Sequence, residues 1–304
     1  MSTPVKTIGF IGIGSMGRPM AARLVAAGYS LIALDANPQA AADFAKESGA
    51  TTASNAAELA RNSDLIVTML PTSAIVESVL AGEEGALAGL KAGTRILEMS
   101  SGVPTQTQKL AEMVQAAGGK LLDAPVSGGV PRAITGELAI MVGGDAADVE
   151  FVRPVLDAMG KSVIHTGIVG SAHAMKALNN LVSAGGFLIG VEALMIGQRF
   201  GLDPEVMVDV LNSSTGMNNS TQKKFKQYVL SRAFNSGFGL DLMVKDLTIA
   251  TGIAEETATP VPFSSLCREL WASAGTMLGK GQDHTAVAKL VEQLAQTELG
   301  GSKD

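Results

Sequence analysis

The chain has 304 residues, of which 46% are hydrophobic and 17% are charged. This composition excludes an intrinsically disordered protein, and the length favours two domains over one. The formal net charge is −6, so the chain lacks the basic excess that releases counterions from nucleic acid. We therefore expect a folded protein without a nucleic-acid partner.

Cysteine, apolar runs and histidine narrow the class further. Cys267 is the only cysteine, so no intramolecular disulfide can form, and a reducing cytoplasmic location is predicted. The start of the chain shows no signal-peptide pattern, and the longest uncharged apolar stretch, 177–191, contains two asparagines and is too short for a membrane span. No metal site is predicted, because the histidines do not have ligand spacing. We interpret each histidine as a surface or loop residue: His165, His173 and His284.

The first half of the chain alternates short, β-branched apolar runs with Ala-rich helical patterns. This alternation is typical of βαβ units that close a doubly wound parallel sheet, and it predicts an α/β domain over residues 1–165. The predicted strands are Thr7–Ile11, Leu31–Leu34, Leu65–Met69, Arg95–Met99, Lys120–Asp123, Leu138–Val142 and Ser162–His165.

The second half, residues 166–304, is predicted to be all-helical. From Ser171 to about Phe200 there is no proline, and apolar residues recur at helical spacing. At about 1.5 Å per residue, such a helix would run roughly 45 Å and could bridge two domains. Further helix-start signals stand at Asp203 and at Asp283.

A glycine pattern follows the first predicted strand. Gly12, Gly14 and Gly17 have the spacing of a dinucleotide-binding turn, with Ile13, Ser15 and Met16 between them. The first glycine permits the turn, the second lets backbone approach a pyrophosphate, and the third lets the helix pack closely on the strand. The helix that begins near Ser15 would present its positive end to the pyrophosphate.

Asp35 ends the second predicted strand, 18 residues after Gly17. A carboxylate at this place accepts hydrogen bonds from an adenosine ribose and repels a 2′-phosphate, and no arginine follows it. We therefore predict NAD as the cofactor, with NADP disfavoured. The alternative is that Asp35 only caps the turn before Pro38.

Two further groups of polar residues are candidates for binding substrate. Ser127, Gly128 and Gly129 follow a strand, and their hydroxyl and backbone N–H groups could hold a carboxylate; alternatively, they form a polar turn. Lys176, Asn179 and Asn180 share one face of the long predicted helix. Desolvation would lower the pKa of Lys176 and prepare it to exchange a proton with a hydroxyl, unless the helix only presents it to solvent.

Weaker candidates lie nearby in the sequence. Ser101 ends a strand and could contact nicotinamide or substrate, although serine is also a common helix cap. Met69, Leu70 and Pro71 could wall the cofactor groove or only close a strand. The lysines at 223, 224 and 226 are interpreted as a solvated helix face, and Cys267 as a small buried apolar residue.

Four motifs in this order resemble the β-hydroxyacid dehydrogenase family, which includes 3-hydroxyisobutyrate dehydrogenase and tartronate semialdehyde reductase. They are the glycine turn at 12–17, the stretch 123–129, the stretch 170–180, and the stretch from Phe238 to Leu247. The resemblance implies a Rossmann-type domain followed by a helical domain like the C-terminal domain of 6-phosphogluconate dehydrogenase. It also implies a homodimer or homotetramer that assembles through the helical half.

The resemblance further implies roles for single residues. Lys176 would be the acid/base, Asn180 would hold the substrate, and Ser127 with the two following glycines would take its carboxylate. Ser101, Phe238 and Lys245 would border the nicotinamide, and Asp246 would order this region. Asn218 and Asn219 fall in a segment that varies with substrate, and their polarity points to a hydroxylated acid such as threonate or glycerate.

These expectations combine into an NAD-dependent dehydrogenase of a small 3-hydroxy acid, with residues 166–304 as the domain for substrate and oligomerisation. Two alternatives remain open. One is an enzyme of the same fold that acts on an imine or a phosphorylated sugar acid, for which the lysine cluster could be recruited. The other is a non-catalytic dinucleotide-binding scaffold, since fold alone does not determine function.

Overall fold

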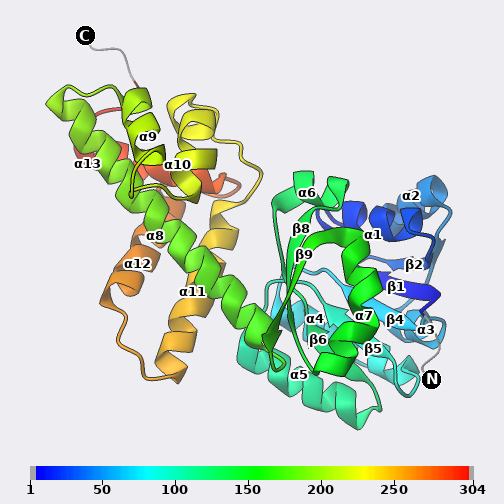
Figure 1. Cartoon of the computed structure of the whole chain (residues 1–304). Helices are drawn as coiled ribbons and strands as arrows, with labels where there is room; N and C mark the ends of the chain where they lie inside the picture. The colour runs from blue at the N-terminus through cyan, green and yellow to red at the C-terminus, as the bar shows by residue number, and fades with distance from the viewer. Residues whose placement is uncertain (1–4, 301–304) are drawn as a thin grey trace. The chain divides into compact units, whose positions relative to one another are not determined.

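The computed structural model describes residues 5–300, which form two compact units. The first unit ends at Lys176 and the second begins at Ala177. Helix α8 (Ser171–Phe200) continues from one unit into the other (Figure 1). The position of the domain boundary, predicted between residues 165 and 166, stays a prediction.

The first unit is built on a nine-stranded sheet, and the doubly wound prediction is confirmed. The strands β3, β2, β1, β4, β5 and β6 lie side by side in this order, and all are parallel. The chain adds β2 and β3 on one side of β1 and continues on the other side from β4, so the strand order reverses between β1 and β4. Strand β8 then pairs antiparallel with β6 and β7, while β9 pairs parallel with β8. The strands are β1 (Thr7–Ile11), β2 (Ser30–Leu34), β3 (Thr51–Thr52), β4 (Leu65–Thr68), β5 (Arg95–Glu98), β6 (Lys120–Asp123), β7 (Val126–Ser127), β8 (Leu138–Gly143) and β9 (Gly160–Gly167).

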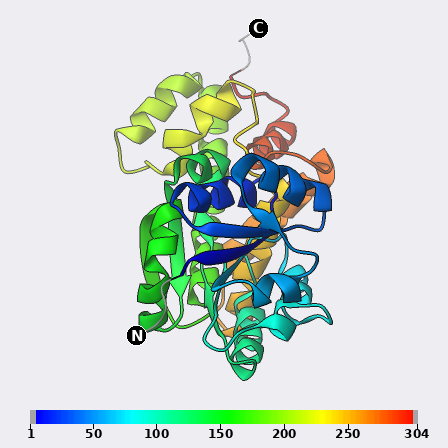
Figure 2. The same cartoon turned by 90° about the vertical axis from the view of Figure 1, so that its right-hand side faces the viewer.

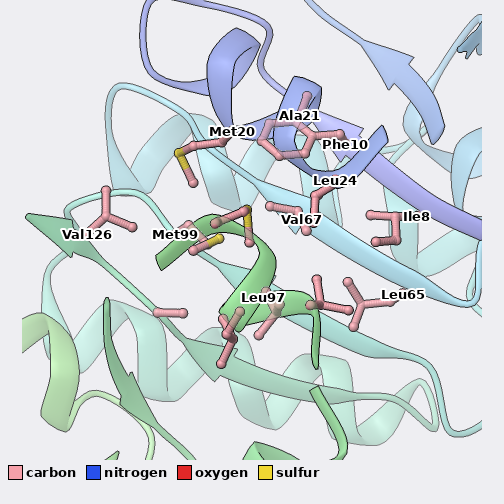
Figure 3. Close-up of a cluster of buried hydrophobic side chains, with 14 of the residues drawn as sticks. Ile8, Phe10, Met20, Ala21, Leu24, Leu65, Val67, Leu97, Met99 and Val126 are labelled. Atoms are coloured by element: carbon pink, nitrogen blue, oxygen red, sulfur yellow. The ribbon is translucent and has the colours of Figure 1, made fainter. Parts of the chain in front are cut away.

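Helices cover both faces of this sheet, which explains why its strands are apolar at consecutive positions. Ile8 and Phe10 of β1 belong to one buried cluster (Figure 3). Ile11 of the same strand belongs to a different cluster, on the opposite face of the sheet. Figure 2 shows α1 and α2 in blue on one side of β1 and β2, with the cyan helices on the other. One face is covered by α1 (Gly17–Ala26), α2 (Pro38–Ser48), α6 (Gly129–Thr135) and α7 (Ala146–Met159). The other is covered by α3 (Ala56–Arg61), α4 (Ser73–Ala81), η1 (Ala86–Gly89) and α5 (Pro104–Ala116).

The second unit is all-helical, as predicted. Its core centres on Phe187 of α8, whose ring meets Phe225 edge-on at 5.3 Å and Trp271 at 5.9 Å between centroids. Asp203 caps the helix predicted to start there, because its carboxylate accepts a hydrogen bond from Glu205 N at 2.7 Å. The remaining elements are α9 (Pro204–Asn212), α10 (Asn219–Lys223), the π-helical turn η2 (Phe225–Leu230), α11 (Leu240–Glu256), α12 (Pro262–Leu278), η3 (His284–Val287) and α13 (Ala288–Ala295).

Helix α8 extends beyond the uncharged stretch 177–191, which is too short to span a membrane. Within residues 5–300, it is the one helix long and apolar enough to cross a membrane by length and composition. Its most apolar 18-residue stretch is 56% buried inside the protein, as in the core helix of a soluble protein. Length and composition alone are therefore weak support for a membrane span.

Candidate active site

The turn between β1 and α1 requires glycine at two places for reasons internal to the protein. Gly12 has a φ of +103°, and a Cβ there would lie 2.2 Å from the carbonyl oxygen of Met69. A Cβ on Gly17 would lie 1.8 Å from the carbonyl oxygen of Gly12. Gly14 differs, since a Cβ there would meet no heavy atom within 4 Å. The free space above Gly14 fits the approach of a dinucleotide pyrophosphate, which a side chain would block.

The start of helix α1 is open to an anion. The helix begins at Gly17, two residues later than predicted, and Met16 occupies its N-cap without a side-chain hydrogen bond. Gly14 and Ser15 are exposed, whereas Ile13 is buried. The first-turn N–H groups of a helix have no partner within the helix and lie at its positive end, so a phosphate would find donors here.

Asp35 is held beside this turn. Its Oδ2 accepts a hydrogen bond from Ile13 N at 2.7 Å, and its Oδ1 accepts one from Asn37 N at 2.8 Å. The second bond is the local turn cap considered as the alternative, and the first links the end of β2 to the glycine turn. The structure thus combines both interpretations, and the ribose contact of Asp35 stays a prediction.

The residues after β4 lie at the point where the strand order reverses, which is where open α/β sheets bind ligands, and the residues after the neighbouring β5 lie beside them. Met69 N donates to Ile11 O at 2.9 Å, and Leu70 N donates to Ser100 Oγ at 2.9 Å. Met69 and Leu70 are half-buried and Pro71 is exposed, while Ser101 is half-buried. Their contacts with a cofactor stay predictions.

Ser127 closes β7, and the two glycines after it begin α6. Gly128 has a φ of +132° and Gly129 a φ of +67°, backbone conformations that side chains with a Cβ rarely adopt. Both glycines are exposed. Gly128 is the N-cap residue of α6, and as a glycine it has no side chain that could bond the first backbone N–H groups of the helix. The loop therefore suits both a tight turn and the binding of a carboxylate.

Sequence reasoning missed a carboxylate that caps α8. Asp123, at the end of β6, is fully buried. Its Oδ1 accepts from Gly170 N at 2.8 Å, and its Oδ2 accepts from His173 N at 2.9 Å. Gly170 directly precedes α8 and His173 lies in its first turn, so both groups are at the helix start, where a negative charge is favourable. The end of a central strand thereby determines where α8 begins.

His173 was interpreted as a surface or loop residue, and this was wrong. Its ring is fully buried, with Nε2 lying 2.8 Å from Glu98 Oε2 and 3.0 Å from the carbonyl oxygen of Ser100. Its Nδ1 lies 2.8 Å from the Thr107 hydroxyl, which donates its own hydrogen to Val103 O at 3.0 Å. Both ring nitrogens therefore have hydrogen-bond partners, and Nε2 faces two acceptors, so Nε2 carries a proton. His284 is buried too, against the same expectation.

The pKa values of His173 and Glu98 agree with a charged pair. Burial alone would lower the pKa of His173, but the charge and hydrogen bond of Glu98, together with Asp123, raise it above its ordinary value. Burial alone would raise the pKa of Glu98, but the charge of His173 and hydrogen bonds from His173 and Ser100 lower it. A buried acid at the end of an apolar strand, as at Glu98, is the signal that could have predicted this partner.

Lys176 follows one turn after His173 on α8. The residue is only 8% exposed, so it is not the solvated lysine of the alternative interpretation. Lysine is seldom buried to this extent. Because Asp123 and His173 hold the preceding turn, the position of the Lys176 backbone is tied to the ends of β5 and β6.

In the second unit, Asn180 continues the same helix face and lies against α11. Its Nδ2 donates to Asp246 Oδ2 at 2.6 Å, and its Oδ1 accepts from Asn179 Nδ2 at 3.2 Å. Lys245 Nζ lies 3.6 Å from Asp246 Oδ1. The structure therefore brings together four of the predicted residues in this unit. The role of Asp246 in ordering this region stays a prediction.

Asn218 has a structural use that weakens the argument for a polyhydroxylated substrate. Its Oδ1 accepts from Ser220 N and Thr221 N, which caps α10, and its Nδ2 donates to Gly186 O at 3.3 Å. Asn219 is exposed on the first turn of α10. A role for either residue in binding substrate stays a prediction. Phe238 packs its ring edge-on against His284, with centroids 5.6 Å apart.

Comparisons with known proteins agree with this arrangement. Residues 7–167 match the NAD binding domain of 6-phosphogluconate dehydrogenase, and residues 170–291 match the NAD-binding family of NADP-dependent 3-hydroxyisobutyrate dehydrogenase. The chain is 37% identical over 297 residues to 2-(hydroxymethyl)glutarate dehydrogenase of Eubacterium barkeri, covering 97% of this chain and 98% of that protein. It is 35% identical over 297 residues to an NAD-dependent L-serine dehydrogenase of Pseudomonas aeruginosa, covering 95% and 98%.

A solved structure of Mycobacterium tuberculosis 3-hydroxyisobutyrate dehydrogenase with L-serine superposes with a TM-score of 0.87 at 31% identity, covering 94% of this chain and 99% of that one. Identity at this level over the full length decides the family. The chain belongs to the 3-hydroxyisobutyrate dehydrogenase family.

As a 3-hydroxyisobutyrate dehydrogenase family member, the protein is an NAD(P)-dependent 3-hydroxyacid dehydrogenase. Its partners are the dinucleotide and a small hydroxy acid. Two features of this dehydrogenase fit a bound dinucleotide: the free space above Gly14 and the start of α1, which has no side-chain cap.

The buried pair of this family member predicts a pH-dependent stability. The raised pKa of His173 contributes stability that is full below its ordinary value of 6.5 and is lost as pH rises through its folded-state pKa. The lowered pKa of Glu98 contributes stability that is present above its ordinary value of 4.5 and is lost as pH falls through its folded-state pKa. We expect His173→Gln to lower the free energy of unfolding by about 3–5 kcal/mol, most strongly between these two pH values.

Urea unfolding of the wild type and His173→Gln at pH 6 and pH 9 measures this difference. Glu98→Gln combined with His173→Gln is the control, because removing both charges should cost less than the two single losses added together. Equal losses at both pH values, with additive single effects, would contradict a charged pair.

Proposed function

We propose that the protein oxidises a small 3-hydroxy acid with NAD, and that Lys176 accepts the proton of the substrate hydroxyl. The observation that carries this proposal is the buried Lys176, on a helix whose first turn is tied to the sheet by Asp123 and His173. A lysine so placed can exchange a proton with a bound alcohol, and a fixed backbone limits the positions its amine can take.

The other residues of the chain would orient the substrate. Ser127 and the backbone of Gly128 and Gly129 would hold the carboxylate, because a hydroxyl and consecutive N–H groups are donors for an anion. Asn180 would donate to the substrate from one turn beyond Lys176, in an orientation that its bond to Asp246 maintains. The dinucleotide supplies the hydride acceptor when bound. In the reverse direction, protonated Lys176 would return its proton to the oxygen of the semialdehyde.

Substrates of the relatives suggest which acids to test first. 3-Hydroxyisobutyrate, L-serine and 2-(hydroxymethyl)glutarate each place a hydroxymethyl group beside a carboxylate, which is the arrangement that Lys176 and the loop at 127–129 would recognise. The exposed Asn219 gives threonate and glycerate a place in the same panel. These acids differ in the other group on the carbon that bears the carboxylate. Comparing their rates therefore tests the protein residues that surround that group.

The role of Lys176 predicts a large effect on turnover. We expect Lys176→Ala to lower kcat by a factor of about 10² to 10⁴, the usual loss when a general acid/base is removed. Binding of the dinucleotide, followed by fluorescence titration, should persist because the glycine turn is intact. Lys223→Ala is the matched control, since it removes an equal charge from an exposed position. Near-normal turnover by Lys176→Ala would remove Lys176 from the reaction.

We propose that NAD is preferred over NADP, since the Asp35 carboxylate lies beside the glycine turn and would repel a 2′-phosphate. Asp35→Asn keeps an oxygen that can accept from the backbone but removes the charge. We expect it to lower the ratio of kcat/KM with NAD to kcat/KM with NADP by about tenfold or more. Asp43→Asn, an exposed aspartate on α2, is the control. A wild type with higher kcat/KM for NADP refutes this preference.

We also propose that the chain forms a homodimer or homotetramer through the helical unit. Apolar side chains are exposed along α8 at spacings of seven, seven and four residues, which places them on one side of the helix. They are Val182 at 77% exposure, Ile189 at 56%, Ile196 at 71% and Phe200 at 84%. A large exposed apolar stripe of this kind marks a contact surface.

Assembly predicts a molar mass in solution that is a multiple of 31.1 kDa. We expect Ile196→Glu to shift the mass measured by light scattering toward one chain, because it would bury a charge in the contact. Leu294→Glu on α13, another exposed apolar position, should leave the mass unchanged. A wild type with the mass of one chain would overturn assembly.

A further inference from the structure

Lys224 lies between α10 and η2 and was expected to be a solvated lysine, but its side chain turns inward. Its Nζ lies 3.3 Å from Ser183 Oγ on α8, and 5.9 Å from the centroid of the Phe187 ring. The neighbouring lysines behave differently, because Lys223 is exposed and Lys226 forms an ion pair with Asp209 at 2.6 Å. The three lysines therefore do not act as one basic cluster.

The charge of Lys224 is only partly offset by the residues that the structure describes. Lys224 forms no ion pair within residues 5–300. The negative charge of Asp283 raises the pKa of Lys224, but the Asp283 carboxylate already accepts hydrogen bonds from Ser236, Gly237 and Thr285. Burial lowers the pKa of Lys224 to about 8, despite the opposing effect of Asp283. A partly buried ammonium whose main partner is a neutral hydroxyl is costly unless an anion joins it.

This ammonium stands on the same helix face as the proposed substrate contacts. Ser183 follows Asn180 by three residues on α8, which is about one helical turn. Asn180 is held by Asp246, so an acid that reaches Asn180 and extends along the helix would next meet Ser183 and Lys224. Ser183 is half-buried, so its hydroxyl is partly accessible to a ligand.

We propose that Lys224 and Ser183 bind a second carboxylate of the substrate, and that the protein therefore prefers dicarboxylic 3-hydroxy acids. The inference rests on the proposed function, because it assigns the substrate class of the same site. A carboxylate suits this pair, since one ammonium and one hydroxyl match a single negative charge. A phosphate dianion would call for further cations, and Lys223 and Lys226 are directed elsewhere.

The decisive comparison uses two acids that differ only at the far end. These are 2-(hydroxymethyl)glutarate and 2-(hydroxymethyl)pentanoate, in which a methyl group replaces the distal carboxylate. We expect wild-type kcat/KM to be higher for the diacid, and Lys224→Met to lower the diacid-to-monoacid ratio by about ten- to a hundredfold, mainly through KM. Lys226→Met is the matched control and should keep the wild-type ratio. Melting temperatures confirm that the variants are folded.

The pH dependence gives a readout that a structural role for Lys224 would not produce. The ratio of kcat/KM for the diacid to kcat/KM for the monoacid should fall as pH rises through about 8, where Lys224 loses its proton. In Lys224→Met, this ratio should not change across the same pH range. The other groups facing Lys224 do not titrate there. Burial and the Lys224 charge lower the pKa of His284 to about 4, and hydrogen bonds lower that of Asp283 despite its burial.

Failure of this inference can be told apart from failure of the proposed function. If the wild type oxidises the monoacid at least as well as the diacid, or if Lys224→Met leaves the ratio unchanged, the second-carboxylate site is refuted while the dehydrogenase stands. If neither acid is oxidised, calorimetry with glutarate and butyrate decides the matter. Tighter binding of glutarate that Lys224→Met abolishes supports the site, and equal binding of both refutes it. A preference for a phosphorylated hydroxy acid over the diacid also overturns the proposal.

Discussion

The buried contact between the His173 ring and the Glu98 carboxylate is the interaction on which the proposed chemistry depends. It joins the end of β5 to the first turn of α8, and Asp123 joins the end of β6 to the same turn. Two charges out of water are stable only when their hydrogen bonds are complete. Here Glu98 also accepts from Ser100 N, and both nitrogens of His173 have hydrogen-bond partners. Lys176, one turn later, takes its place from this network.

The glycine turn shows how packing and ligand binding share one short segment. Gly12 and Gly17 are glycines because the protein's own carbonyl oxygens occupy the space of a side chain. Gly14 has no such neighbour, so the space above it is open to a ligand. Asp35 links the end of β2 to this turn, because its carboxylate accepts a hydrogen bond from Ile13 N.

The helical unit handles its buried charges in two ways. Asp246 and Asp283 are held by donors of the protein itself, from Asn180 in one case and from the turn at 236–238 in the other. The Lys224 ammonium lies beside the Ser183 hydroxyl and the Phe187 ring, and it forms no ion pair with any residue from 5 to 300. The buried His173 of the first unit lies 2.8 Å from Glu98, whereas Lys224 has no carboxylate in direct contact among those residues. That difference is why Lys224 points to a charged group brought by the substrate.

Local pattern alone was sufficient for seven of the nine strands, the long helix and the glycine turn, because periodicity and the spacing of Gly12, Gly14 and Gly17 are properties of short segments. It did not predict the two-residue strands β3 and β7 or the antiparallel pairing of β8, which depend on long-range packing. It also made Lys176 a candidate base, while the family resemblance gave it that role and burial in the structure argues against a solvated lysine. It could not show that His173 pairs with Glu98, because 75 positions separate them and only the closing of β5 against α8 brings them together. Nor could it separate Lys224 from Lys223 and Lys226, or Asn218 as a cap from Asn218 as a ligand. Those distinctions depend on which neighbours long-range packing supplies, and no window of sequence contains them.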